Sequence, residues 1–149
     1  MSFDIYIGEA VLDVPSAQDA SEGALIEAYV EHVTLLDAPV FAGDIMTGNG
    51  NSRHPGYSQW AEFCKITHLD DLFFDESVGL MRAHPGCVLL QPHHRAAVRK
   101  ALGKWEEEHQ GAHAGFENGQ DGILARLLWL DFWIGWALAN CKVPAIYNH

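Results

Sequence analysis

The sequence predicts an α+β fold in which a short, acidic, antiparallel N-terminal sheet packs on about three main helices. Apolar and polar residues alternate over residues 3–13, which is typical of a half-buried strand. Two later segments, 92–109 and 121–140, are long and carry the apolar stripes of helices. The 149 residues, of which 48% are hydrophobic, fit one folded domain spanning residues 1–149.

Two strands are expected in the N-terminal third. In the first, Phe3, Ile5 and Ile7 alternate with Asp4 and Tyr6. Residues 26–36 also alternate, and although a helical stripe fits there too, their Tyr, Val and Thr content favours a strand. The two strands can pair antiparallel, and they need the helices because a lone hairpin is only marginally stable.

Three helices are expected, over about residues 58–67, 92–109 and 121–140. Ser58 is placed to cap the first, and Pro92 suits the first position of the second. Pro144 prevents continuation of the third. We expect loops over residues 37–55 and 68–91, where Gly, Pro and Asp are frequent.

The charges of the helix over residues 92–109 oppose its dipole. Arg95, Arg99 and Lys100 lie early in this helix, whereas three consecutive Glu residues lie late, at 106–108. Each such placement costs about a few tenths of a kcal/mol. We therefore expect packing to stabilise this helix, and the early bases are candidates for another role.

The net charge of −11 comes from 20 acidic and 9 basic residues. It excludes a nonspecific nucleic-acid binder and argues against attachment to an anionic membrane surface. The first 52 residues hold nine acids and no Lys or Arg, whereas the other residues hold 11 acids and 9 bases. A solvated acidic face explains this pattern, and so does a surface that docks a basic partner or mimics nucleic acid.

The cysteine spacing and the apolar segments indicate in which cellular compartment the protein is expected. Three widely spaced cysteines without a C-x-x-C pair suit a reducing cytoplasm. The N-terminus has no basic segment followed by an apolar run, so we expect no signal peptide. The most apolar stretch, residues 123–139, contains Arg126 and Asp131 and is shorter than the roughly 20 residues of a membrane span. We therefore expect a cytoplasmic protein without a membrane-spanning helix.

The segment over residues 43–60 has the composition of a ligand-binding loop. Its glycines let backbone amides approach a ligand, its Asn and Ser side chains offer hydrogen bonds, and its arginine and aromatic rings suit a phosphate and a base. No known phosphate-loop pattern occurs, and a structural loop whose polar residues satisfy turns is the alternative. The candidate ligand-binding residues are Asn49, Asn51, Ser52, Arg53, Tyr57 and Trp60 and, farther from the ligand, Arg82 and His84.

Metal and enzyme motifs are not recognisable. The pairs His84-x-x-Cys87 and His109-x-x-x-His113 have plausible zinc spacings, but a zinc site needs three or four convergent ligands. No zinc-protease, deaminase or serine-nucleophile pattern occurs. We therefore expect no metal, no cofactor and no catalytic residue. A small hydrolase with paired acids, such as those at residues 70–71, is the alternative.

Three tryptophans, Trp129, Trp133 and Trp136, lie at i, i+4 and i+7 on one face of the last helix. This helix is apolar nearly all round, which is typical of a helix at the centre of a fold or shared between subunits. The tryptophans belong either to the core, to an oligomer interface or to the wall of an aromatic pocket. We expect self-association through this face.

Three stretches of the sequence are distinctive as text. They are DAPVFAGDIMTGNGNSRHPGYSQWAEFC, LFFDESVGLMRAHPGC and ARLLWLDFWIGWALANCKVPAIYNH. Together with the opening MSFDIYIGEA, they resemble an uncharacterised group of small proteins from tailed bacteriophages and prophages. The likeness covers roughly residues 37–149. It implies an accessory phage protein that acts in a bacterial cytoplasm, and it implies no activity, cofactor or catalytic residue.

These observations favour a phage-encoded, non-enzymatic protein that sequesters a small anionic, nucleotide-derived host signal and so counters a host defence. In this hypothesis Arg53 pairs with phosphate while Tyr57 and Trp60 stack the base. An acidic protein can bind an anion where its few bases converge. An acidic inhibitor of a basic host protein, such as a nuclease, is the first alternative, and a small hydrolase is the second.

Overall fold

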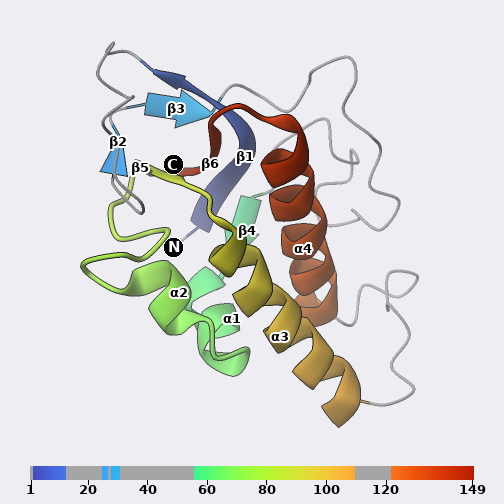
Figure 1. Cartoon of the computed structure of the whole chain (residues 1–149). Helices are drawn as coiled ribbons and strands as arrows, with labels where there is room; N and C mark the ends of the chain where they lie inside the picture. The colour runs from blue at the N-terminus through green and yellow to red at the C-terminus, as the bar shows by residue number, and fades with distance from the viewer. Residues whose placement is uncertain (1, 13–24, 27, 31–55, 110–121) are drawn as a thin grey trace.

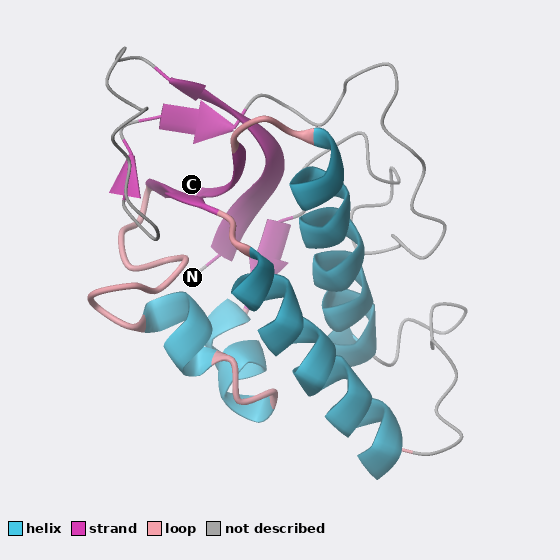
Figure 2. Cartoon of the chain, viewed as in Figure 1, coloured by secondary structure: helices cyan, strands magenta, loops and turns pink. Residues whose placement is uncertain are grey.

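The computed structural model describes residues 2–12, 25–26, 28–30, 56–109 and 122–149 (Figure 1). It confirms the α+β class, because an antiparallel sheet packs beside a group of helices (Figure 2). In chain order the elements are β1 (Ser2–Leu12), β2 (Leu25–Ile26), β3 (Ala28–Val30), β4 (Gly56–Ser58), α1 (Trp60–Ile66), α2 (Asp70–Phe74), β5 (Gly86–Leu89), α3 (Pro92–Glu108), α4 (Gly122–Asn140) and β6 (Pro144–Asn148).

The sheet is organised around β1. Its strand order is β2-β5-β6-β1-β3, and β4 also pairs with β1. Residues 2–4 of β1 pair with β4, residues 5–9 with β6 and residues 10–12 with β3, all antiparallel. The expected pairing of the two N-terminal strand segments is therefore confirmed for β1 and β3. Of the acids expected to make this sheet acidic, all but Asp4 and Glu9 lie outside the described residues.

Three strands and one helix arise where the sequence predicted none. β4 lies where the expected loop meets the first expected helix, β5 lies at an expected turn, and β6 follows the last expected helix. β5 and β6 are nevertheless interior strands of the sheet. Pro144 begins β6, a position where a strand tolerates proline. The sheet is thus built from segments along the whole chain rather than from the N-terminal third alone. α2 is a five-residue helix within the segment expected to be a loop.

All four helices contribute to the main core on one face of the sheet. The side chains of Phe3, Ile5 and Ile7 enter this core from β1, as their alternation predicted. α4 contacts α3, β1 and β6, so the expectation that the Trp-rich C-terminal helix is central is confirmed (Figure 1). The other face of the sheet carries a smaller cluster, formed by Ala10, Cys87 and Ala145 with partly buried neighbours that include Tyr6 and Tyr147.

The ends of α1 differ from the prediction. Ser58 belongs to β4, and Gln59 is the N-cap in a left-handed conformation with φ 58°. At the other end, Leu69 N–H donates to the Cys64 carbonyl (2.8 Å) and His68 N–H donates to the carbonyl of residue 65 (3.3 Å). These two bonds define a Schellman motif. His68, with φ 59°, occupies the position that usually holds glycine.

Among the described residues there is one helix, α4, whose length and apolar composition would allow it to cross a membrane; its mean hydropathy is 1.4. Part of it, 44% of the most apolar window, is buried within the chain. Core helices of soluble proteins meet the same criteria, so this is weak evidence for a span. The expected cytoplasmic localisation stays a prediction.

Candidate functional site

The predicted ligand-binding residues fall into two groups. Asn49, Asn51, Ser52 and Arg53 lie outside the described residues, so their contacts with a ligand stay predictions. The others belong to elements whose backbone is described. They are Tyr57, Trp60, Arg82 and His84.

Tyr57 and His84 are connected through Phe3 at one end of the sheet. β4 pairs with the start of β1, and in this register Tyr57 is opposite Phe3. The Phe3 ring meets the His84 imidazole edge-on, with 4.8 Å between the ring centroids. Phe3 is thus the shared neighbour of Tyr57, through the strand register, and of His84, through the ring contact, although 26 residues separate Tyr57 from that histidine in the sequence.

The His84 ring is solvent-exposed but held in one orientation by Asn148. Nδ1 of His84 lies 2.5 Å from Oδ1 of Asn148, whose side chain is buried. The Asn148 amide nitrogen donates to the carbonyl oxygens of Ala83 (3.0 Å) and Gly86 (3.4 Å), which leaves its oxygen to face the imidazole. An amide oxygen can only accept, so Nδ1 of His84 carries a proton.

This orientation defines what His84 can do. In the neutral ring Nε2 has no proton and can accept a hydrogen bond from a ligand hydroxyl or amine. In the protonated ring Nε2 becomes a charged donor suited to phosphate or carboxylate. Because Asn148 fixes Nδ1, both states present the same nitrogen atom to a ligand.

Arg82, two residues before His84, carries a buried donor without a partner among the described residues. Its Nη1 atom is buried and makes no hydrogen bond in the described part of the chain. A buried donor left without an acceptor costs about 1–3 kcal/mol, and more when the group is charged. Such groups nearly always have an acceptor in folded proteins. An anion beside Arg82 would supply one.

Trp60 lies in the core. Its side chain is fully buried, and its ring packs against Phe63 and Phe73, with centroids 4.6 Å and 5.4 Å away. A base could stack on this ring only if those neighbours moved. The sequence carried a signal for this placement, because Trp60, Phe63 and Cys64 form the apolar stripe predicted for α1.

The three tryptophans of α4 also pack mainly within the chain. Trp129 and Trp133 are buried in the main core, and Trp136 is partly buried with its ring edge-on to Trp133. Of the three, Trp136 is therefore the one with surface left for a second chain. Self-association stays a prediction.

Metal ligation and thiol chemistry find little support among the described residues. No group of three or more His, Cys, Asp or Glu there could hold a metal ion. Cys87 is fully buried, while Nδ1 of His84 is engaged by an amide, and His113 lies outside the described residues. Burial raises the pKa of the Cys64 thiol well above its usual range and that of Cys141 to about 11, with help from Glu9 for the latter. Thiols with raised pKa values are poor nucleophiles.

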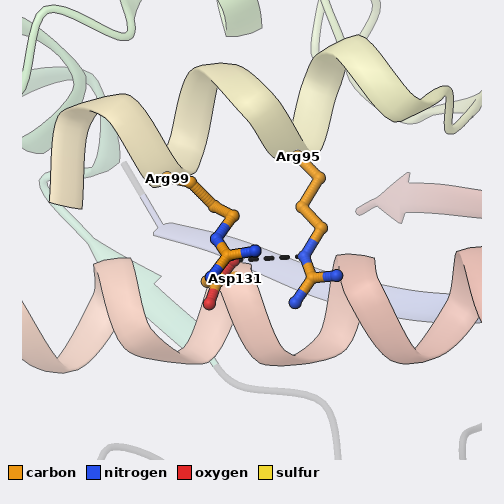
Figure 3. A network of polar contacts seen from close by, with 3 residues as sticks. All are labelled: Arg95, Arg99 and Asp131. Atoms are coloured by element: carbon orange, nitrogen blue, oxygen red, sulfur yellow. Dashed lines mark hydrogen bonds and ion pairs between the residues drawn. The ribbon is translucent and has the colours of Figure 1, made fainter. Parts of the chain in front are cut away.

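A second cationic group lies between α3 and α4 and was not among the predicted site residues. Nε of Arg95 lies 3.2 Å from Oδ1 of Asp131, and Nε of Arg99 lies 3.6 Å from the same oxygen (Figure 3). The sequence carried one signal for it, the placement of these bases against the dipole of α3. Their partner could not be predicted, because it comes from another helix more than 30 positions away.

No protein-family model, no curated protein and no solved structure matches this chain.

Proposed function

We propose that this chain binds a small anionic, nucleotide-like ligand at Arg82 and His84, and that it serves a bacteriophage by sequestering a host signal. The observation that carries the proposal is the buried Nη1 of Arg82, which has no acceptor in the described part of the chain. A guanidinium in this state is suited to phosphate or carboxylate, which accept two of its N–H groups at once.

His84 supports the same ligand class. Its Nε2 atom can donate to an anion when the ring is protonated and can accept from a ribose hydroxyl when it is neutral. Arg53, the predicted phosphate partner, precedes β4 by three residues in the chain. Its contacts lie outside the described residues, so its role as the phosphate partner stays a prediction.

The experiment that tests the proposal measures retained ligand. The purified protein is incubated with a panel of linear and cyclic nucleotides, washed, and heated, and the released small molecules are identified by mass spectrometry. We expect an intact nucleotide from the wild-type protein. We also expect at least about tenfold weaker binding by Arg82→Gln, because a hydrogen bond to a charged group contributes about 1.5–3 kcal/mol.

Lys65→Gln is the matched control, since Lys65 is an exposed cation on α1 whose loss changes the net charge equally. Retention of no nucleotide by the wild-type protein, or equal retention by Arg82→Gln, would refute the proposal. A cleaved nucleotide would instead indicate the hydrolase alternative. Binding of a basic host protein that falls steeply with salt, without any nucleotide, would indicate the acidic inhibitor.

A further inference from the structure

The arginine pair on α3 has more donors than its protein partner uses. Arg95 and Arg99 are at i and i+4, so their side chains are neighbours on one face of the helix. Each approaches Asp131 through Nε alone, and both approach the same carboxylate oxygen (Figure 3). In the described part of the chain, the Nη groups of these two arginines donate no hydrogen bond.

The pair also has an excess charge and is open to solvent. Two guanidinium groups share one carboxylate, which leaves a formal local charge of +1 in a protein whose net charge is −11. The side chains of Arg95 and Arg99 are 38% and 63% exposed, whereas that of Asp131 is 19% exposed. A dissolved ligand can therefore reach the guanidinium groups, while the carboxylate lies behind them and orients them.

Gly135 keeps the Arg95 guanidinium against α4. A Cβ atom at this position would lie 2.5 Å from Cζ of Arg95 and 2.7 Å from its Nε, closer than real contacts allow. Glycine within a helix costs about 1 kcal/mol relative to alanine, so a close approach is the usual reason for its presence. The glycine therefore allows the guanidinium to lie directly on the backbone of α4.

A tie between the two helices does not explain this arrangement. One arginine that donates two parallel N–H bonds to the Asp131 carboxylate would connect α3 to α4 with better geometry than two single Nε contacts. The second arginine adds repulsion, and Arg95 lies at the end of the first turn of α3, where the helix dipole disfavours a cation. A ligand that accepts from both guanidinium groups would offset these costs.

We propose that Arg95 and Arg99 form an anion site that takes a phosphoryl group, distinct from the site proposed above at Arg82. A phosphoryl group has three terminal oxygens in a tetrahedral arrangement, so it can accept from two neighbouring guanidinium groups at once. A carboxylate has two coplanar oxygens and matches one fork. Asp131 is a positioning residue, because it holds both Nε atoms and leaves the Nη groups for the ligand.

The test is calorimetric titration of the full chain at pH 7 and constant ionic strength. The probes are inorganic phosphate, methyl phosphate and acetate. We expect both phosphates to bind more tightly than acetate. We expect Arg99→Gln to weaken phosphate binding at least tenfold while Arg95 still contacts Asp131 and keeps the helices together. Arg99→Lys keeps the charge but lacks the planar guanidinium with its paired N–H donors, so it should weaken phosphate binding too.

Two further variants separate the site from bulk electrostatics and from the fold. Lys104→Gln removes an exposed cation from the same helix and should leave phosphate binding unchanged. Gly135→Ala should displace the Arg95 guanidinium and weaken binding without removing a charge. Tighter binding of methyl phosphate than of inorganic phosphate would identify a phosphomonoester as the ligand, and the reverse would identify free phosphate.

The site is refuted if acetate binds as tightly as phosphate, if Arg99→Gln binds phosphate normally, or if Lys104→Gln weakens binding as much. It is also refuted if Arg82→Gln abolishes phosphate binding while Arg99→Gln does not. That last result would leave the function proposed at Arg82 standing, so the two proposals can fail separately.

Discussion

Acid should destabilise the first turn of α3 through His94. This side chain is 2% exposed, and its Nδ1 atom accepts a hydrogen bond from the backbone N–H of Gln91 at 2.8 Å. Burial, with a smaller effect of the neighbouring His93, lowers the pKa of His94 to about 4. Protonation would remove the acceptor and place a buried charge near the start of a helix, where the dipole disfavours cations.

The sign and size of the effect follow from linkage. In the unfolded chain the pKa of a histidine is about 6.5, so the unfolded state takes up the proton first as the pH falls. The contribution of neutral His94 to stability is therefore fully present above pH 6.5 and is lost as the pH falls to about 4. A difference of about 2.5 pKa units corresponds to about 3 kcal/mol of unfolding free energy.

His94→Gln isolates this effect. Glutamine at the third position of a helix can accept from the N-cap N–H without titrating. Urea unfolding of wild-type and variant protein, followed by tryptophan fluorescence at pH 7, 5.5 and 4.5, gives the unfolding free energies. We expect the unfolding free energy of the variant, relative to that of the wild type, to rise by about 2–3 kcal/mol as the pH falls from 7 to 4.5.

His93→Gln is the control, because His93 is exposed on the same turn and has only the smaller effect on the pKa of His94; this variant should keep most of the pH dependence of the wild type. The reasoning is refuted if the difference in unfolding free energy between wild type and His94→Gln is the same at pH 7 and pH 4.5.

Three further predictions concern stability and thiol reactivity. His68→Gly should raise the unfolding free energy by about 1 kcal/mol, because glycine adopts the left-handed conformation at this Schellman position without strain; an unchanged or lower urea midpoint would contradict it. Glu9→Ala should lower it by about 2–4 kcal/mol, since the carboxylate accepts hydrogen bonds from the backbone of Lys142 and Val143 and so joins the α4–β6 connection to β1; a loss below 0.5 kcal/mol, roughly the effect of an ordinary surface substitution, would contradict this. Cys64, fully buried and with a raised pKa, should react with a thiol reagent only after unfolding; rapid modification of the native protein would show that the core opens there.

Elements encoded by local periodicity could be predicted from the sequence. β1 shows the alternation of Phe3, Ile5 and Ile7, and α3 and α4 have apolar stripes over several turns. β5 and β6 could not be predicted in this way. They are only four and five residues long, and they are stabilised by pairing with strands far away in the sequence, as in the Tyr6–Tyr147 pair across β1 and β6. The five residues of α2 likewise contain too little repeat for a helical pattern.

The site residues show the same division between local and distant signals. Trp60 was assigned to a ligand because of the loop before it, although its spacing from Phe63 already indicated a core position. Arg82 and His84 have no local pattern that signals a site. Their candidate roles depend on a buried atom that has no acceptor among the described residues and on an amide from the other end of the chain. Composition suggests the kind of ligand, whereas tertiary structure selects the side chains.

Asp131 contributes both to the contact between α3 and α4 and to the local charge at that contact, because it pairs with two arginines of α3. It lies in a mostly apolar helix, where an unpaired carboxylate would be costly. Its neutralisation by one arginine would suffice for stability, yet two approach it, and α4 has a glycine where one of them rests. Each feature has a cost alone: a charge in an apolar helix, cations against a dipole, and a glycine within a helix. Their coincidence at one point between α3 and α4 is best explained by a shared anionic ligand, and this is why an acidic protein can still carry a local anion site.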